Sequence, residues 1–172
     1  MSIIISSISC LIFFDRMDPT HYRINFVPCL CQFSCRKQTG TGYEIERVED
    51  GRVTFLGDEE AICRANIFLR TAERVLIQVG RFRATTFEEL FQGIKALPWE
   101  DYIPEDGKFW VKKASSIKSK LFSPSDIQSI AKKAMVERLK KSYHTEWFKE
   151  DGAPYPVRIF LLKDEVMVTL DT

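Results

Sequence analysis

Residues 43–56 read Tyr-Glu-Ile-Glu-Arg-Val-Glu-Asp-Gly-Arg-Val-Thr-Phe-Leu, and they are the clearest structural pattern in the chain. Its first part alternates apolar and polar residues, as a strand with one buried face does. Asp50-Gly51 is a hairpin-turn dipeptide, so residues 52–56 are predicted to return as an antiparallel strand. Asp58 is a favourable helix N-cap. The helix that it opens has an apolar stripe: Ala61, Ile62, Ala65, Phe68, Leu69 and Ala72.

The rest of the chain continues to alternate strands and helices. Further strands are predicted at residues 74–82, 108–113, 155–162 and 166–170. One helix begins with a capping box, Thr86 to Glu89, and ends before Pro98. The longest helix has Ser123 as its cap and Pro124 at its first position, and it runs to about Tyr143. This order predicts the α+β class, with mixed sheets covered by helices.

Composition excludes several functional classes. The five cysteines do not match a zinc spacing, so we expect reduced thiols in a cytoplasmic protein and no metal. The apolar residues 2–14 are too few to span a membrane. The two histidines lack partners for a catalytic triad, and no glycine-rich phosphate loop occurs. We therefore expect no catalytic residue and no cofactor in this chain.

Charge is distributed unevenly within a net charge of +1. Residues 43–107 carry fourteen acidic and eight basic side chains, whereas residues 108–149 carry eleven basic and three acidic ones. A loop of lysines and serines, residues 114–123, leads into the N-terminus of the longest helix, where amides and the helix dipole favour an anion. The candidate phosphate ligands are Lys112, Lys113, Lys118, Ser119, Lys120, Gln128, Lys132 and Lys133.

Two alternatives remain open at this point. The basic stretch could be a solvated helix face with no partner, since lysine is a common surface residue. Trp99, Trp110 and Trp147 could stack on nucleobases, although packing in the core is the commoner role of large aromatic residues.

Nine short segments carry a resemblance to a known family. They lie at residues 42–44, 51–55, 65–72, 84–91, 96–99, 119–123, 128–134, 161–164 and 170–172. In order and spacing they resemble the THUMP-containing RNA methyltransferases of the RlmL type, which modify the N2 atom of guanine in rRNA. The resemblance covers about three quarters of the chain.

The resemblance implies a ferredoxin-like subdomain that merges into a THUMP domain. On this basis residues 43–85 complete the ferredoxin-like part and residues 86–172 form the THUMP core. A THUMP domain binds structured RNA and presents it to a C-terminal methyltransferase domain that uses S-adenosylmethionine. Because the family's methyl-donor glycine motif is absent from the 172 residues, we expect that domain to be missing and this chain alone to be inactive.

One segment departs from the family pattern. Residues 31–41 lack the apolar stripe of the family's first helix, so we expect residues 1–42 to be a degenerate segment that packs poorly. Two further functional readings stay open. The chain could be a protein-interaction domain without catalytic function, or the THUMP module of another RNA-modifying enzyme, such as a thiouridine or pseudouridine synthase.

Overall fold

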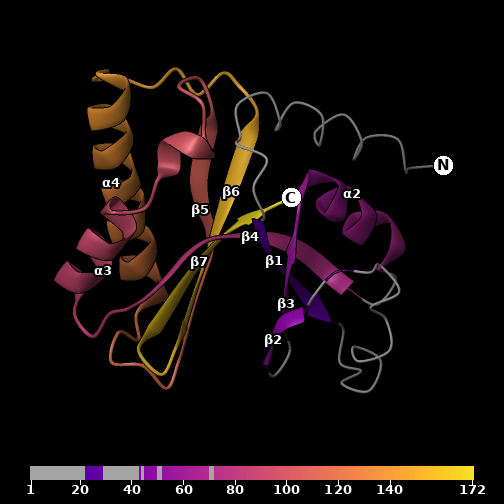
Figure 1. Cartoon of the computed structure of the whole chain (residues 1–172). Coiled ribbons are helices and arrows are strands. Elements are labelled where there is room, and N and C mark those ends of the chain that lie inside the picture. The colour runs from indigo at the N-terminus through magenta and orange to yellow at the C-terminus, as the bar shows by residue number, and fades with distance from the viewer. Residues whose placement is uncertain (1–21, 29–42, 44, 50–51, 70–71) are drawn as a thin grey trace. The chain divides into compact units, whose positions relative to one another are not determined.

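A computed structural model describes residues 22–28, 43, 45–49, 52–69 and 72–172. Within these ranges seven strands are hydrogen-bonded in the order β2-β3-β1-β4-β7-β6-β5, accompanied by three α-helices and a 3-10 turn (Figure 1). The chain divides into a first unit, residues 1–78 with 171–172, and a second unit, residues 79–170. The predicted class of mixed sheets with covering helices is confirmed. The expectation that residues 1–42 pack poorly is wrong for residues 22–28, which form a strand paired on both sides with Ile24 and Asn25 fully buried. The rest of that range, residues 1–21 and 29–42, lies outside the described residues.

The first unit is ferredoxin-like. It contains β1 (Tyr22–Pro28), β2 (Ile45–Glu49), β3 (Arg52–Gly57), α2 (Glu59–Phe68) and the beginning of β4 (Ala72–Arg83). β1 lies between β3 and β4 and is antiparallel to both, while β2 pairs with the other side of β3. This is the strand order of the split β-α-β arrangement. The hairpin of β2 and β3 is as predicted, and its Asp50-Gly51 turn lies outside the described residues.

Helix α2 begins where the sequence predicts and ends earlier. The Asp58 carboxylate accepts a hydrogen bond from the Ala61 amide at 2.9 Å, which confirms the N-cap. Ala61, Ile62 and Ala65 are buried. The predicted stripe is wrong beyond them, because the helix stops at Phe68, whose side chain is 65% exposed, and Ala72 already belongs to β4.

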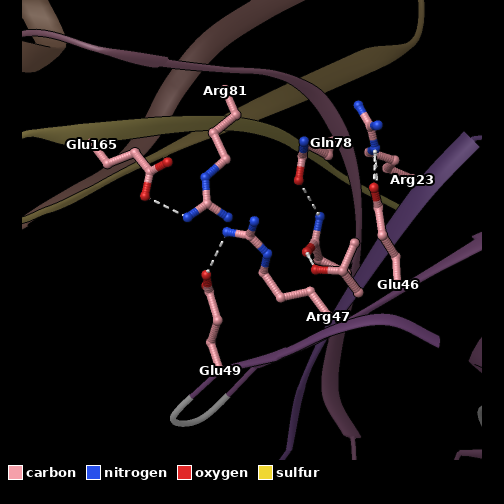
Figure 2. A network of polar contacts seen from close by, with 9 residues as sticks. Arg23, Glu46, Arg47, Glu49, Gln78, Arg81 and Glu165 are labelled. Carbon is pink, nitrogen blue, oxygen red and sulfur yellow. Dashed lines mark hydrogen bonds and ion pairs between the residues drawn. The ribbon is translucent and has the colours of Figure 1, made fainter.

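A buried polar network lies between the strands of the first unit (Figure 2). The side chain of Asn25 is fully buried; it donates to Gln78 Oε1 at 3.3 Å and accepts from the Thr54 hydroxyl. At the surface, Arg23 forms an ion pair with Glu46 at 2.9 Å. The amide of Asn25 therefore has partners on both neighbouring strands, as a buried polar group requires.

The second unit contains the end of β4 and the remaining elements. They are α3 (Phe87–Lys95), η1 (Trp99–Asp101), β5 (Lys108–Ile117), α4 (Pro124–Tyr143), β6 (Pro154–Leu162) and β7 (Glu165–Asp171). β5 is parallel to β6, and β6 is antiparallel to β7. α4 packs against β5, α3 and η1 (Figure 1). Its buried side chains are Ile127, Ala131, Ala134, Met135 and Leu139, and Ile130 is half-buried.

Helix α3 has the predicted capping box. The Thr86 hydroxyl accepts from the Glu89 amide at 3.2 Å, and the Glu89 carboxylate accepts from the Thr86 amide at 3.3 Å. Behind the helix, Trp99 is fully buried and its indole Nε1 donates to Ile94 O at 2.7 Å. Phe87, the first residue of the helix, is 38% exposed, whereas Leu90 and Ile94 are fully buried.

Strand β5 is longer than predicted. The sequence predicts that it ends at Lys113, but it continues through Ile117, which pairs with Leu162 of β6. Two consecutive serines, Ser115 and Ser116, look like a loop in the sequence. The parallel pairing with β6 holds them in the strand, since tertiary pairing outweighs a weak local preference.

The start of α4 differs from the prediction in one detail. Pro124 occupies the first helical position as predicted. Ser123 is the N-cap by its backbone, but its hydroxyl makes no capping bond and instead lies 3.2 Å from the Ser125 hydroxyl. A side-chain cap by Ser123 is therefore not formed.

Candidate nucleic-acid interface

The loop between β5 and α4 is bound to the turn between β6 and β7. The Ser119 hydroxyl donates to Ile117 O at 3.1 Å and accepts from the Asp164 amide at 3.0 Å. The Lys120 amide donates to Asp164 Oδ1 at 2.8 Å, and the Lys163 amide donates to Ile117 O at 3.1 Å. Three of these hydrogen bonds join the turn to the end of β5 and the loop after it, and the bond from Ser119 to Ile117 orders the loop itself.

Three exposed lysines lie on this loop and turn, and we name Lys118, Lys120 and Lys163 the lysine tip. Lys118 and Lys163 have φ angles of 51° and 52°, in the left-handed region. Asp164 follows with a φ of 64°, so the two-residue turn has the backbone of a type I′ hairpin. The backbone thus fixes the points from which these ammonium groups extend.

The acidic groups beside the lysine tip already have partners. Two bonds from Thr85, first its amide and then its hydroxyl, lower the pKa of Glu89, and the positive charge of Lys120 lowers it further. The carboxylate of Asp164 accepts the bond from the Lys120 amide. These two carboxylates reduce the positive charge of the tip; the hydrogen bonds of Glu89 cap the start of α3, whereas that of Asp164 orders the tip itself.

Lys112 and Lys113 are exposed on β5 for a structural reason. Neighbouring residues of a strand normally point to opposite faces. Here the register shifts between Val111 and Lys113, and such a bulge re-aims side chains. Lys113 is the register partner of Arg158 on β6, which places two cationic residues side by side on the sheet. The two lysines extend the positive charge along β5, away from the lysine tip.

Lys132 is directed toward the sheet. Its ammonium group donates to Phe109 O and to Glu150 Oε1, the latter at 3.1 Å. It also lies 3.9 Å from the centroid of the Phe109 ring, which is a cation–π contact. Phe109 and Ile117 lie at opposite ends of β5, about 26 Å apart at the rise of a strand. Lys132 is therefore remote from the lysine tip.

The other two predicted residues on α4 are neither part of the lysine tip nor bound to the sheet as Lys132 is. Lys133 is exposed, with its ammonium 5.8 Å from the Phe91 ring of α3, and Gln128 is half-buried. The first turn of α4 is accessible, since Pro124 and Ser125 are exposed. Asp126 in the same turn is a competing negative charge at the helix N-terminus. The structure thus brings Lys118, Ser119 and Lys120 together and places the other predicted ligands on separate surfaces.

Two residues of this region are missing from the predicted set. Lys163 joins the tip through a contact with Ile117, far away in sequence, so only the Lys-Asp turn could have indicated it. Phe122 follows the loop lysines and is 83% exposed. Of the tryptophans, Trp99 is buried as expected for a core residue, whereas Trp110 is 36% and Trp147 is 83% exposed.

Residues 72–172 and the described ranges before them contain no group of three or more His, Cys, Asp or Glu side chains that could hold a metal ion. Among the helices of those same ranges, none is both long enough and apolar enough to cross a membrane.

The fold and this surface define a class: a ferredoxin-like unit that continues through β4 into an α/β unit with a lysine-rich end. Residues 84–171 match the family model of the THUMP domain, and residues 38–76 match that of the RlmL ferredoxin-like domain. The chain therefore belongs to the THUMP-domain family. Its relatives include methyltransferases, which confirms the family resemblance seen in the sequence.

Three relatives illustrate the similarity. The chain is 51% identical over 133 residues to "Putative RNA methyltransferase YpsC" of Bacillus subtilis, covering 76% of this chain and 34% of the relative. It is 24% identical over 148 residues to the tRNA (guanine(6)-N2)-methyltransferase of Archaeoglobus fulgidus, covering 84% and 37%. The crystal structure of SMU.472, "a putative methyltransferase complexed with SAH", superposes with a TM-score of 0.84 at 39% identity, covering 90% and 42%. The chain spans about a third of the length of these curated relatives.

Proposed function

We propose that this chain is the RNA-binding part of a methyltransferase that modifies the N2 atom of guanine in RNA, with rRNA as the preferred target. The observation that carries the proposal is the match of residues 84–171 to the THUMP domain, within which the lysine tip lies. The match to the RlmL ferredoxin-like domain supports rRNA, whereas the archaeal relative acts on tRNA. S-adenosylmethionine would be bound by a separate catalytic domain, as the SAH-bound relative suggests.

The lysine tip is the part of the proposed interface best suited to phosphate. Its ammonium groups are exposed and its backbone is held by the Ser119 and Asp164 hydrogen bonds. Little order has to be gained when such a surface binds, which favours affinity. Lys112, Lys113 and Lys133 extend the proposed contact. Lys132, Gln128 and Ser119 are weaker candidates, because the Lys132 ammonium and the Ser119 hydroxyl already have partners and Gln128 is half-buried.

Binding measurements with the chain itself test this proposal. Fluorescence anisotropy would follow labelled stem-loop fragments of rRNA, tRNA fragments and a DNA duplex at two salt concentrations. We expect the RNA stem-loops to bind and the affinity to fall steeply with salt, because lysine–phosphate contacts release counterions. Absence of RNA binding at low salt would favour the protein-interaction alternative and contradict the proposal.

The relative affinities for rRNA and tRNA fragments test which RNA is the target. If rRNA fragments bind no better than tRNA fragments, the rRNA preference is wrong. A tRNA target, like that of the archaeal relative, or the module of another RNA-modifying enzyme then becomes the better assignment. The RNA-binding role itself would survive that result, because phosphate contacts position the partner without reading its sequence.

A further inference from the structure

An exposed aromatic side chain projects from the loop that carries the lysine tip. Phe122 is 83% exposed, whereas its neighbour Leu121 is 5% exposed and anchors the loop in the core. The Ser116 hydroxyl donates to Leu121 O, so the backbone just before Phe122 returns to the end of β5. The loop is thus fixed next to Phe122 by the buried Leu121 side chain and by the hydrogen bond from Ser116, while the Phe122 ring is exposed.

Two aliphatic side chains are exposed at the same end of the unit. Ile117 is 57% exposed and Leu162 is 44% exposed. They are register partners in the parallel pair of β5 and β6, so both side chains point to the same face of the sheet. The lysine tip follows each of them directly in the sequence, with Lys118 after Ile117 and Lys163 after Leu162. Apolar and cationic groups are therefore interleaved here.

The charge of this end selects the kind of partner. A purely apolar protein surface would have to desolvate the three ammonium groups without compensation. RNA offers both complements, phosphates for the lysines and the flat faces of bases for the ring. In a duplex these faces are stacked and hidden, whereas unpaired nucleotides expose them.

We propose that Phe122 stacks on an unpaired base of the bound RNA while the lysine tip holds the adjoining phosphates. The inference rests on the proposed function and adds to it a preference for a stem with a single-stranded extension over a blunt stem. Base–aromatic stacking tolerates any base, so the preference concerns unpaired structure and not sequence.

A pair of RNA probes tests the inference: a blunt-ended RNA duplex without unpaired bases, and the same duplex with a short single-stranded extension that contains 2-aminopurine. The wild-type chain should bind the extended probe more tightly and change its fluorescence as the base stacks. Phe122→Ala should weaken binding of the extended probe about tenfold, within the range for loss of one stacked base, and abolish the fluorescence change. Binding of the blunt probe should stay unchanged.

Trp147→Ala is the matched control, because Trp147 is also 83% exposed but follows the other end of α4. It should leave both probes unaffected. Phe122→Trp should restore the preference, since it retains an aromatic face. If the wild-type chain binds both probes equally and Phe122→Ala alters neither, stacking is overturned while RNA binding stands. If neither probe binds at low salt, the proposed function fails together with the inference.

Discussion

At the scale of single residues, the lysines of the second unit have different roles. Lys118 and Lys120 are exposed and no hydrogen bond of their ammonium groups is described, whereas the Lys132 ammonium donates to Phe109 O and Glu150. A lysine in the first situation adds charge at little cost in stability. A lysine in the second joins α4 to β5 and to the segment after α4.

Lys132→Met should therefore destabilise the second unit. The substitution keeps most of the side-chain volume but removes two hydrogen bonds and the cation–π contact with Phe109. We expect the free energy of unfolding, measured by urea denaturation, to fall by about 1–2 kcal/mol. Lys140→Met, at an exposed position of the same helix, is the control and should change it by less than about 0.5 kcal/mol. Equal stability of both variants would show that the Lys132 contacts contribute nothing.

At the scale of elements, the ring of Phe82 on β4 lies so close to the backbone of α3 that only glycine fits at position 93. A Cβ atom added to Gly93 would lie 2.2 Å from the ring of Phe82 on β4. Glycine costs a helix about 1 kcal/mol relative to alanine. The packing of Phe82 onto the helix backbone explains why alanine would not be better here.

Gly93→Ala should thus destabilise the protein although alanine is the better helix former. Overpacking costs about 1–3 kcal/mol, so the net loss should be about 1 kcal/mol. In a Phe82→Ala background the same change should become stabilising, because the ring is gone. Thermal unfolding of the four proteins measures both effects, and the explanation fails if the sign of the Gly93→Ala effect is the same in both backgrounds.

At the scale of the whole molecule, an ion pair links η1 to α4. Arg138 donates to the Glu100 carboxylate through Nε at 3.1 Å and through a second guanidinium nitrogen. The hydrogen bond from Arg138 is the largest cause that lowers the pKa of Glu100 from its ordinary value of 4.5. The unfolded chain consequently binds a proton at a higher pH than the folded one does.

Stability should fall as the pH drops below about 4.5 and through the lowered pKa of Glu100, since protonation of this carboxylate favours the unfolded chain. Glu100→Gln should be less stable than the wild type at neutral pH, and the difference should shrink in acid. Urea denaturation across a pH series measures this. A constant difference at every pH would contradict the role of the charged pair.

Much of the fold could be predicted, because its signals are local. Asp58, the Thr86–Glu89 capping box and Pro124 each mark a helix start within one turn of sequence. The extension of β5 through Ile117 could not be predicted, because it depends on pairing with β6, which lies much later in the chain.

The candidate site was predictable in part for the same reason. The sequence indicated the Lys118–Lys120 loop, but not its meeting with Lys163, which requires the turn to lie against Ile117. It also grouped Lys132 with the loop, because helical spacing does not reveal that its ammonium reaches Phe109. Composition thus identified a basic segment, whereas tertiary contacts decide which of its members are available to a ligand.

The salt dependence of RNA binding shows directly whether the lysine tip contacts the phosphates of the RNA. Neutralising the tip in the triple variant Lys118→Gln, Lys120→Gln and Lys163→Gln should weaken stem-loop binding. The plot of log affinity against log salt has a negative slope, and its magnitude should decrease by about 2–3, close to one unit per lost phosphate contact. A control variant with Lys140→Gln and Lys141→Gln, in the last turn of α4, should retain the wild-type slope. A triple variant with the wild-type slope, beside a control whose slope has fallen, would place the RNA elsewhere and contradict the account.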